Sequence, residues 1–235
     1  MQGRVSSIQS MGTLDGPGVR FVVFMQGCPL RCTCCHNPET WDPNGGTAYT
    51  AEEIFKKAVR YRPYFKTKGG ITLSGGEPLL QPEFITELFS LCRENGIHTC
   101  LDTSGCLWNQ EIARVLSLTD YVLLDMKYTT DALYQEYVGC SMSAPLQFLE
   151  KLQEKSIPTV LRQVIIPGYN DTSENINALV HLKASHSCVQ KTELLPFRKI
   201  CISKYEALKI PFPFANIPAP SRTEMKKLES MLQNA

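Results

Sequence analysis

The chain is organised around the stretch Gly27-Cys28-Pro29-Leu30-Arg31-Cys32-Thr33-Cys34-Cys35-His36-Asn37. Within it, Cys28, Cys32 and Cys35 have the spacing CxxxCxxC. Three thiolates this close in sequence can ligate three irons of a cubane cluster, which leaves the fourth iron open to a small molecule. The stretch therefore predicts a [4Fe-4S] cluster with one open iron.

Other roles fit parts of the same stretch. Cys32 and Cys35 form half of a zinc site, with Cys28 and His36 nearby, but the sequence has no second CxxC and no HxxxH. A thioredoxin-like redox pair would not need Cys28. Four cysteines within eight residues argue against simple apolar packing. The spacing favours the cluster, and a non-catalytic zinc or closed-cluster redox module stays open as the alternative.

Composition limits the classes of protein that fit. The chain has 235 residues, of which 43% are hydrophobic, enough for one domain with a substantial core. A net charge of +1 gives no global field for nucleic acid or an acidic membrane surface. The start of the chain has no signal-peptide pattern, and no apolar run is long enough to span a bilayer. We therefore expect a cytoplasmic protein, in whose reducing compartment cysteines are metal ligands or free thiols.

Short apolar runs of the kind found in buried parallel strands alternate with helical patterns. A helix over 51–61 starts at a capping box formed by Thr50 and Glu53, and Asp171 is the expected cap of a later helix. We expect residues 1–13 to form an arm or hairpin and residues 38–49 and 211–220 to be loops. The predicted strands are 20–25, 70–73, 98–101, 121–124, 159–166 and 192–195, and the other helices are 82–96, 109–117, 130–138, 144–155 and one that follows the capping box Ser221–Glu224.

This alternation predicts an α/β fold with a parallel sheet and right-handed crossovers. Polar or Gly-rich segments directly follow the first four predicted strands. We therefore expect the active site at the carboxyl edge of the sheet. We expect one domain over 1–235, made of an arm and turn (1–19), the sheet region (20–210) and a Pro-rich loop with a C-terminal helix (211–235).

Six further sequence motifs accompany the cysteine spacing. They are Asp15-Gly-Pro-Gly18-Val-Arg20, Cys35-His-Asn-Pro-Glu-Thr-Trp41, Ser74-Gly-Gly-Glu77, Leu101-Asp-Thr-Ser-Gly105, Leu124-Asp-Met-Lys127 and Leu194-Leu-Pro-Phe197. Together they resemble the radical S-adenosylmethionine superfamily and, within it, the family that activates glycyl-radical enzymes. Related activating enzymes often carry a ferredoxin-like insert after the first motif, and here His36-Asn37 runs straight on to Trp41. The resemblance is therefore to the pyruvate formate-lyase branch, and another glycyl-radical client stays open.

The resemblance implies an incomplete six-stranded (β/α)6 barrel of the radical SAM type. It implies an enzyme that cleaves S-adenosylmethionine reductively at the [4Fe-4S] cluster, under anaerobic conditions. The resulting 5′-deoxyadenosyl radical would take a hydrogen from one glycine of pyruvate formate-lyase. A flavodoxin or ferredoxin is the expected electron donor, and the expected state is a monomer with neither nucleic acid nor membrane as partner.

The resemblance also assigns roles to residues. It implies that the cluster and the cofactor carry out the chemistry and that no side chain is catalytic. It makes Asp102 part of a monovalent cation site and Asp15 part of the loop that receives the lyase. Without it, the same residues could be a strand-end cap, tight turns or a surface ion pair. The implied cluster ligands are Cys28, Cys32 and Cys35, and the implied contacts to S-adenosylmethionine are Cys34, His36, Gly75, Gly76, Glu77, Asp125, Met126, Lys127 and Arg198.

Two positions depart from the family pattern. Cys34 stands where an aromatic residue usually lies against the adenine. Arg198 stands where a histidine lies near the cofactor, and a guanidinium cannot accept a hydrogen bond. We do not expect Cys34 to be a fourth ligand, because it would have to turn toward the same cluster as Cys35.

Overall fold

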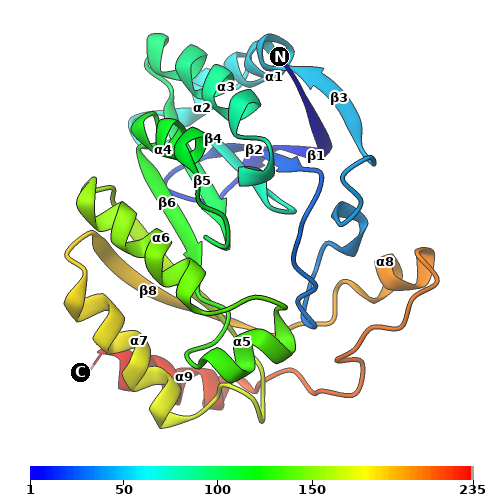
Figure 1. The fold of residues 1–235 in the computed structure, drawn as a ribbon, viewed down its shortest axis with the longest axis vertical. Coiled ribbons are helices and arrows are strands. Elements are labelled where there is room, and N and C mark those ends of the chain that lie inside the picture. The colour runs from blue at the N-terminus through cyan, green and yellow to red at the C-terminus, as the bar shows by residue number, and fades with distance from the viewer. Residues whose placement is uncertain (234–235) are drawn as a thin grey trace. The chain divides into compact units, whose positions relative to one another are not determined.

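The computed structural model describes residues 1–233, in which eight strands form one sheet in the order β3-β1-β2-β4-β5-β6-β7-β8 (Figure 1). The six predicted strands are all present, and the mostly parallel α/β sheet is confirmed. Two strands were missed. β1 (Gln2–Gly12) comes from the expected arm and β3 (Thr47–Thr50) from the expected loop, and β1 pairs antiparallel with both β2 and β3. Neither has the continuous apolar run that marks the buried strands.

The elements keep close to the predicted bounds. The remaining strands are β2 (Arg20–Met25), β4 (Gly70–Gly75), β5 (His98–Thr103), β6 (Tyr121–Asp125), β7 (Thr159–Ile165) and β8 (Val189–Pro196). The helices are α1 (Ala51–Val59), α2 (Arg62–Phe65), α3 (Pro82–Glu94), α4 (Gln110–Ser117), α5 (Asp131–Tyr137), α6 (Ser143–Glu154), α7 (Ser173–Ser185), α8 (Ile202–Ala207) and α9 (Arg222–Gln233), with short 3-10 turns η1 (Pro38–Thr40) and η2 (Pro78–Leu80). Helices α2 and α8 were not predicted.

The helix starts show why these residues form helices here. The capping box of α1 is confirmed, since the Glu53 amide donates to Thr50 Oγ1 over 3.2 Å and Glu53 Oε2 accepts from the Thr50 amide over 2.8 Å. The predicted cap of α7 is wrong by one residue. Thr172 accepts from the Asn175 amide, whereas Asp171 accepts from the Gly168 amide in the preceding turn.

The chain divides into two compact units, which we describe separately. Unit 1 contains Met1–Pro29 and Thr40–Leu123, and unit 2 contains Leu30–Glu39 and the residues from Leu124 onward. None of the described helices is long and apolar enough to cross a membrane.

Unit 1 is built on the parallel strands β2, β4 and β5, with Met25 opposite Gly75 in the register of β2 and β4. Helix α3 packs on β5 and is flanked by α1 and α4 (Figure 1). The apolar stripe of α3, which includes Phe84 and Leu88, is fully buried. Because parallel strands end at the same edge, the segments that follow β2, β4 and β5 come together at one edge of this unit.

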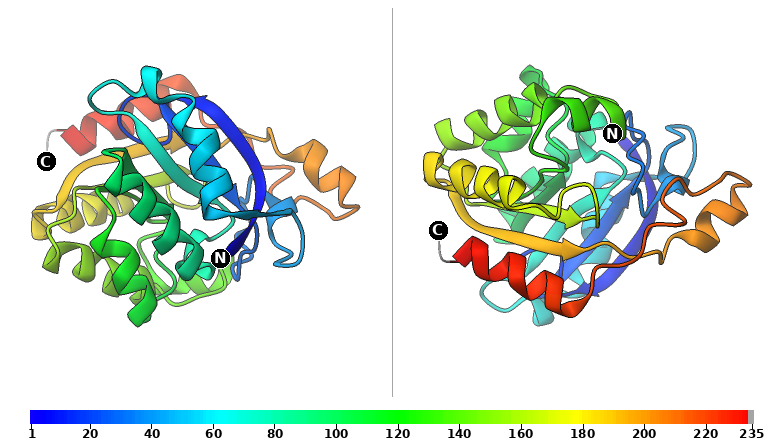
Figure 2. Two further views of the ribbon diagram at one scale, coloured as in Figure 1. Left: turned by 90° about the horizontal axis from the view of Figure 1, so that it is seen from above. Right: turned by 90° about the horizontal axis from the view of Figure 1, so that it is seen from below.

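Unit 2 is built on the parallel pair β7 and β8, with α7 packed against β8 and α9. Figure 2 shows α9 running beside β8. An aromatic group fills the other side of the unit: Tyr169 packs on Phe214 with ring centroids 4.8 Å apart, and Tyr137 packs edge-on to Tyr169 at 5.1 Å. Phe197, directly after β8, packs edge-on to Phe214. The rings anchor the Pro-rich loop 211–220 to the end of α5.

Candidate cluster and cofactor site

The cysteine loop follows the carboxyl end of β2, as predicted. In unit 2, its residues are pinned by the end of α5: the Arg31 amide donates to the Val138 carbonyl over 3.2 Å and the Thr33 amide to the Tyr137 carbonyl over 2.9 Å. The last carbonyls of a helix lack partners inside it, so this helix end and the loop satisfy each other. Backbone hydrogen bonds therefore fix this part of the loop, and Thr33 Oγ1 adds a donation to the Tyr137 carbonyl over 3.4 Å.

Cys35 sits in a tight turn whose polar groups point at its sulfur. Its amide donates to the Cys32 carbonyl over 3.1 Å, and the Asn37 amide lies 3.4 Å from Cys35 Sγ. Tyr205, on α8, donates to the Cys35 carbonyl over 3.2 Å. A backbone N–H aimed at a sulfur stabilises the thiolate, which is the form that binds metal.

The donor set of the loop fits an iron–sulfur cluster better than one zinc ion. Cys28, Cys32 and Cys35 are partly exposed, and none of them forms a disulfide. Among the described residues, no three His, Cys, Asp or Glu side chains converge closely enough to hold one metal ion. Zinc needs its ligands around one centre, whereas the thiolates of a cubane bind different irons. The residues present therefore fit the predicted cluster.

The pKa of the Cys34 thiol bears on whether Cys34 could be a fourth ligand. Burial raises the pKa of its thiol to about 11, and the Lys127 ammonium lowers it less than burial raises it. A thiol with that pKa is protonated at neutral pH, and only the thiolate is a good ligand. This supports the expectation that Cys34 is not a cluster ligand.

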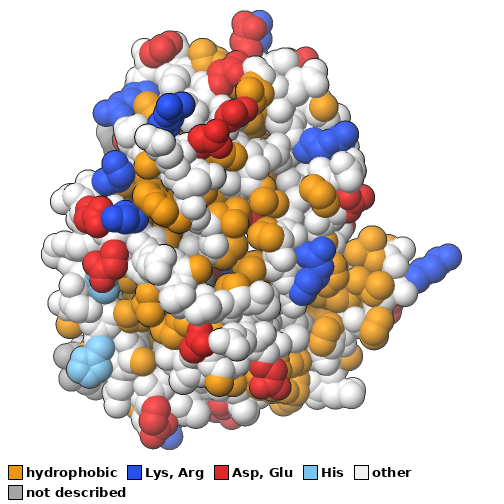
Figure 3. Space-filling view, viewed as in Figure 1, with side chains coloured by type: hydrophobic (Ala, Val, Ile, Leu, Met, Phe, Trp, Pro, Cys, Tyr) orange, Lys and Arg blue, Asp and Glu red, His pale blue; other side chains and the backbone are white. Residues whose placement is uncertain are grey.

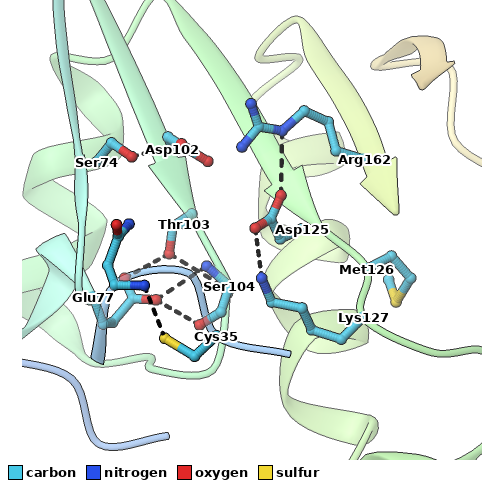
Figure 4. A network of polar contacts seen from close by, with 12 residues as sticks. Cys35, Ser74, Glu77, Asp102, Thr103, Ser104, Asp125, Met126, Lys127 and Arg162 are labelled. Atoms are coloured by element: carbon cyan, nitrogen blue, oxygen red, sulfur yellow. Dashed lines mark hydrogen bonds and ion pairs between the residues drawn. The ribbon is translucent and has the colours of Figure 1, made fainter. Parts of the chain in front are cut away.

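Glu77 lies at the carboxyl edge of unit 1, after β4, and is only 1% exposed. Four donors reach its carboxylate (Figure 4): Thr103 Oγ1 at 2.6 Å and the Leu79 amide at 3.1 Å on Oε1, and the Ser104 amide at 3.0 Å and Ser104 Oγ at 2.5 Å on Oε2. All four donors are uncharged. The side chain of Glu77 thus ties η2 to the end of β5 and is already occupied by protein groups.

The glycines before Glu77 also have a reason within the fold itself. We expected Gly75 and Gly76 to let a ligand approach the backbone. A Cβ on Gly75 would lie 2.4 Å from the Met25 nitrogen, and one on Gly76 would lie 2.2 Å from the Gly27 carbonyl oxygen. Gly75 also has a φ of +109°. The approach that requires glycine here is that of the strand β2 backbone.

Asp102, the expected cation-site residue, lies on β5 beside β4. Its Oδ2 accepts from Ser74 Oγ over 2.7 Å (Figure 4). The structure therefore joins two of the sequence motifs, Ser74-Gly-Gly-Glu77 and Leu101-Asp-Thr-Ser-Gly105, through three hydrogen-bonded pairs of residues.

In unit 2, Asp125 ends β6 and stands between two cations. Lys127 Nζ lies 2.6 Å from its Oδ2 and Arg162 Nε 3.2 Å from its Oδ1 (Figure 4). Burial would raise the pKa of Asp125, but the Lys127 and Arg162 charges hold it below its usual value. Burial alone would lower the pKa of Lys127, and the Asp125 carboxylate raises it well above the usual value. The three groups carry one negative and two positive charges at neutral pH.

His36 and Arg198 are brought together, but not as expected. His36 Nε2 lies 2.8 Å from the Arg198 carbonyl oxygen, so Nε2 carries the hydrogen. Burial lowers the pKa of His36, which keeps the ring neutral. The Arg198 side chain is exposed. The contact at Arg198 is therefore made by its backbone, which any residue type could supply.

Asp15 lies away from the other predicted site residues of unit 1. The Asp15-Gly-Pro-Gly turn joins β1 to the amino end of β2, whereas the cysteine loop follows the carboxyl end. The Asp15 carbonyl accepts from Thr72 Oγ1 over 2.7 Å. Arg20, fully buried, donates to Thr72 Oγ1 over 2.9 Å and to the Pro17 carbonyl over 3.4 Å. The structure thus gives this turn a rigid support at the opposite edge of the sheet.

Sequence reasoning missed several partners in these networks. Arg162 lies inside the apolar run of β7, where nothing in the sequence marks it as the partner of Asp125. Thr103 and Ser104 belong to a word that was noticed, but their bonds to Glu77 depend on the pairing of β4 with β5. A charged residue within a mostly apolar strand was the one signal that could have drawn attention to Arg162, and it does not identify Asp125 as the partner.

Comparison with known proteins agrees with this geometry. The family model described as the Radical SAM superfamily matches residues 22–180. The pyruvate formate-lyase-activating enzyme of Clostridium pasteurianum is 44% identical over 234 residues, which cover 99% of this chain and 98% of that protein. The pyruvate formate-lyase 1-activating enzyme of Escherichia coli K12 is 38% identical, over 98% of this chain and 95% of that protein.

Solved structures show the same fold at lower identity. A domain of a pyruvate-formate lyase-activating enzyme from Bacteroides vulgatus gives a TM-score of 0.59 at 24% identity, over 71% of this chain and 94% of that one. SuiB from Streptococcus suis, bound to S-adenosylmethionine, gives 0.68 at 15% identity, over 88% and 44%. The chain therefore belongs to the radical SAM superfamily and, within it, to the family of pyruvate formate-lyase-activating enzymes.

Proposed function

We propose that this protein activates pyruvate formate-lyase by generating a glycyl radical on it under anaerobic conditions. The observation that carries the proposal is the sequence identity of 44% and 38%, over nearly the whole chain, to two relatives that are named as activating enzymes of pyruvate formate-lyase. Further support is a loop with three partly exposed cysteines in the spacing CxxxCxxC, none of them in a disulfide, which is supported by backbone hydrogen bonds. Cys28, Cys32 and Cys35 are the ligands that we assign to the cluster.

When bound, the [4Fe-4S] cluster and S-adenosylmethionine supply the reductive bond cleavage and the radical that takes a hydrogen from a glycine of the lyase. The protein's own residues bind and orient. Lys127 is a cation suited to the methionyl carboxylate, with Asp125 beside it as an acceptor, and Met126 and His36 belong to the same unit. In unit 1, we assign the backbone of Gly75 and Gly76 to the methionyl amino group and leave the Glu77 side chain its supporting role.

The remaining site residues complete the proposal. Asp102, held by Ser74, would supply a carboxylate to a monovalent cation. Cys34 and the Arg198 backbone would line the cofactor, and Asp15 would meet the lyase.

A flavodoxin or ferredoxin would supply the electron. Support for its docking comes from the segment around α8, which contacts the Cys35 carbonyl through Tyr205 and leaves Ile200 71% and Leu208 43% exposed. Figure 3 shows hydrophobic side chains gathered over α8. Exposed apolar groups of this kind often mark a contact with another protein. A reducing, cytoplasmic compartment suits a protein whose ten cysteines form no disulfide, and we expect the chain to be a monomer.

The experiment that tests the function is anaerobic electron paramagnetic resonance. Reconstituted protein is mixed with reductant, S-adenosylmethionine and a pyruvate formate-lyase from the same source. We expect a glycyl-radical doublet that grows only when all components are present. Formation of 5′-deoxyadenosine without the doublet would keep the chemistry and move the client to another glycyl-radical enzyme. Neither product, from protein with an intact reduced cluster, would contradict the proposal.

Two adjacent variants test the ligand assignment. Cys35→Ala removes one of the three assigned ligands, so we expect it to lose the open-site cluster and all cleavage of S-adenosylmethionine. Cys34→Ala is the matched control and should keep both, because the Cys34 thiol is protonated. Iron and acid-labile sulfide analysis after anaerobic purification measures the outcome. Loss of the cluster in Cys34→Ala, or zinc without sulfide in the wild type, would show the assignment to be wrong.

A further inference from the structure

The phenol of Tyr134 makes two hydrogen bonds to consecutive residues of the Leu124-Asp-Met-Lys127 motif. Its oxygen accepts from the Lys127 amide over 2.9 Å and its hydroxyl donates to Met126 Sδ over 3.4 Å. The side chain is buried, with 1% exposure, and lies on α5. One buried oxygen therefore holds both the backbone of Lys127 and the side chain of Met126.

Both of these groups need such a partner. The Met126 amide still donates to the Arg162 carbonyl of β7 over 2.8 Å, and the chain leaves that strand pairing at Lys127. A backbone N–H in the protein interior must find an acceptor, and Tyr134 supplies it. A methionine side chain is flexible and its sulfur is a weak acceptor, so a donated O–H selects one position for it.

Helix α5, which carries Tyr134, also holds the cysteine loop. The carbonyls of Tyr137 and Val138 at its end accept from the amides of Thr33 and Arg31. The start of the same helix is capped by Thr130, whose hydroxyl accepts from the Leu133 amide. One short helix thus sets two distances at once: its end fixes the loop with Cys32 and Cys35, and its buried hydroxyl fixes Met126 and Lys127.

We propose that Tyr134 is a positioning residue that holds Met126 and Lys127 in register with the Cys32–Cys35 loop, and that it thereby sets the affinity for S-adenosylmethionine. This inference rests on the proposed function, because Lys127 and Met126 matter for affinity only if they contact that cofactor. Tyr134 itself contacts neither cofactor nor cluster in this proposal. Its effect passes through the backbone of Lys127 and the thioether of Met126.

The variant Tyr134→Phe removes the hydroxyl and keeps the ring. We expect the dissociation constant and KM for S-adenosylmethionine to rise about tenfold, the effect of a buried N–H that loses its acceptor. The rate of 5′-deoxyadenosine formation at saturating cofactor should change less than about twofold, because no group at the reacting bond is altered.

The matched control is Tyr128→Phe. Tyr128 is equally buried and packs edge-on to Tyr134 with centroids 6.4 Å apart, but the hydrogen bonds to Met126 and Lys127 come from Tyr134. Removing the Tyr128 hydroxyl leaves both of those bonds in place, so the cofactor affinity should stay unchanged. A general loss of packing in the aromatic group would affect the two variants alike, so the control separates packing from positioning.

The measurements use cluster-loaded protein kept anaerobic. Equilibrium dialysis of S-adenosylmethionine against the oxidised cluster gives the dissociation constant without turnover. Hydrogen–deuterium exchange read at the Lys127 amide reports the bond to Tyr134 directly. We expect protection at Lys127 to fall about tenfold or more in Tyr134→Phe and to stay unchanged in Tyr128→Phe.

The outcomes separate the two proposals. Weaker binding with lost protection at Lys127, in Tyr134→Phe alone, supports the positioning role. Wild-type affinity in Tyr134→Phe, or equal losses in both variants, overturns it while the proposed function stands. A wild-type protein that does not bind S-adenosylmethionine overturns the proposed function, and the inference about Tyr134 with it.

Discussion

Glu77 in unit 1 and Asp125 in unit 2 are both carboxylates at or after the end of a strand, but they differ in exposure and in the charge of their partners. Glu77 is 1% exposed and takes four hydrogen bonds from uncharged donors. Asp125 keeps 24% of its side chain exposed and faces two cations. One carboxylate is shielded by dipoles, and the other is balanced by charge.

The difference indicates what each carboxylate is for. Four hydrogen bonds from protein donors occupy both oxygens of Glu77, so its role is to hold η2 against the end of β5. Asp125 and its partners have one cation in excess and stay partly accessible, so the group is suited to an anionic ligand. The first arrangement should therefore affect stability most, and the second should affect ligand binding most.

The largest effect is expected from Glu77→Ala. The four donors lose their acceptor inside unit 1, and each unsatisfied buried donor costs about 1–3 kcal/mol. Allowing for partial rearrangement, we expect the free energy of unfolding to fall by about 3–5 kcal/mol. Urea denaturation under anaerobic conditions measures it.

Two further variants control the Glu77 experiment. Glu77→Gln keeps one acceptor oxygen and should lose roughly half as much stability. Glu52→Ala removes an exposed partner of Lys56 and should change stability by less than about 1 kcal/mol. A loss below about 1 kcal/mol in Glu77→Ala would mean that the network around it carries little energy and that the contrast with Asp125 is mistaken.

The next effect is expected from Lys127→Met, which keeps the stem of the side chain and removes its charge. If Lys127 binds the methionyl carboxylate, the affinity for S-adenosylmethionine should fall about tenfold to a hundredfold, the range for a lost charged hydrogen bond. Stability should change by only about 1 kcal/mol, because Asp125 keeps Arg162 and some solvent.

Equilibrium dialysis and denaturation measure the two effects of Lys127→Met side by side. The matched control is Lys151→Met, which removes an exposed partner of Glu154 on α6 and should leave affinity unchanged. If Lys127→Met loses stability like Glu77→Ala and keeps its affinity, the roles that we assign to the two carboxylates would be reversed.

Much of the fold could be predicted because its signals are local. Strand β2 is a short, mostly apolar run of buried residues, and the first helix has both members of a capping box in the sequence. β1 could not be predicted this way. Its buried and exposed residues alternate irregularly, its pairing with β2 contains register shifts, and what makes it a strand is the partner on either side.

The sequence predicts the site only within each short, contiguous motif. The cysteine spacing and the words around Glu77 and Asp125 are contiguous, so the sequence displays them. The bonds between words depend on which strands are neighbours: Arg162 reaches Asp125 from 37 residues away, and Ser104 reaches Glu77 from 27. Tyr134 gives no sequence signal at all, since its two hydrogen bonds arise from where α5 packs.

The smallest expected effect is the pH dependence of stability that comes from Asp125 and its two cationic partners. The Lys127 and Arg162 charges hold the pKa of Asp125 below its usual value in spite of burial. In the unfolded chain the same group titrates near ~3.9, so the unfolded chain binds the proton more readily than the folded one. Stability from this group is therefore fully present above that pKa and is lost as the pH falls through the lower, folded pKa.

Arg162→Met removes one of the two cations and should make this acid dependence shallower. Above about pH 5 the wild type should be more stable by about 1 kcal/mol, and the difference between the two proteins should shrink as Asp125 becomes protonated in both. Urea denaturation from pH 6 downward measures it, with Lys191→Met, an exposed partner of Glu193, as the control that should show no such trend. A stability difference that stays constant over this pH range would mean that Arg162 contributes by packing its stem in β7. In that case Asp125 would depend on Lys127 alone, and the region would be a simple ion pair rather than a carboxylate held between two charges.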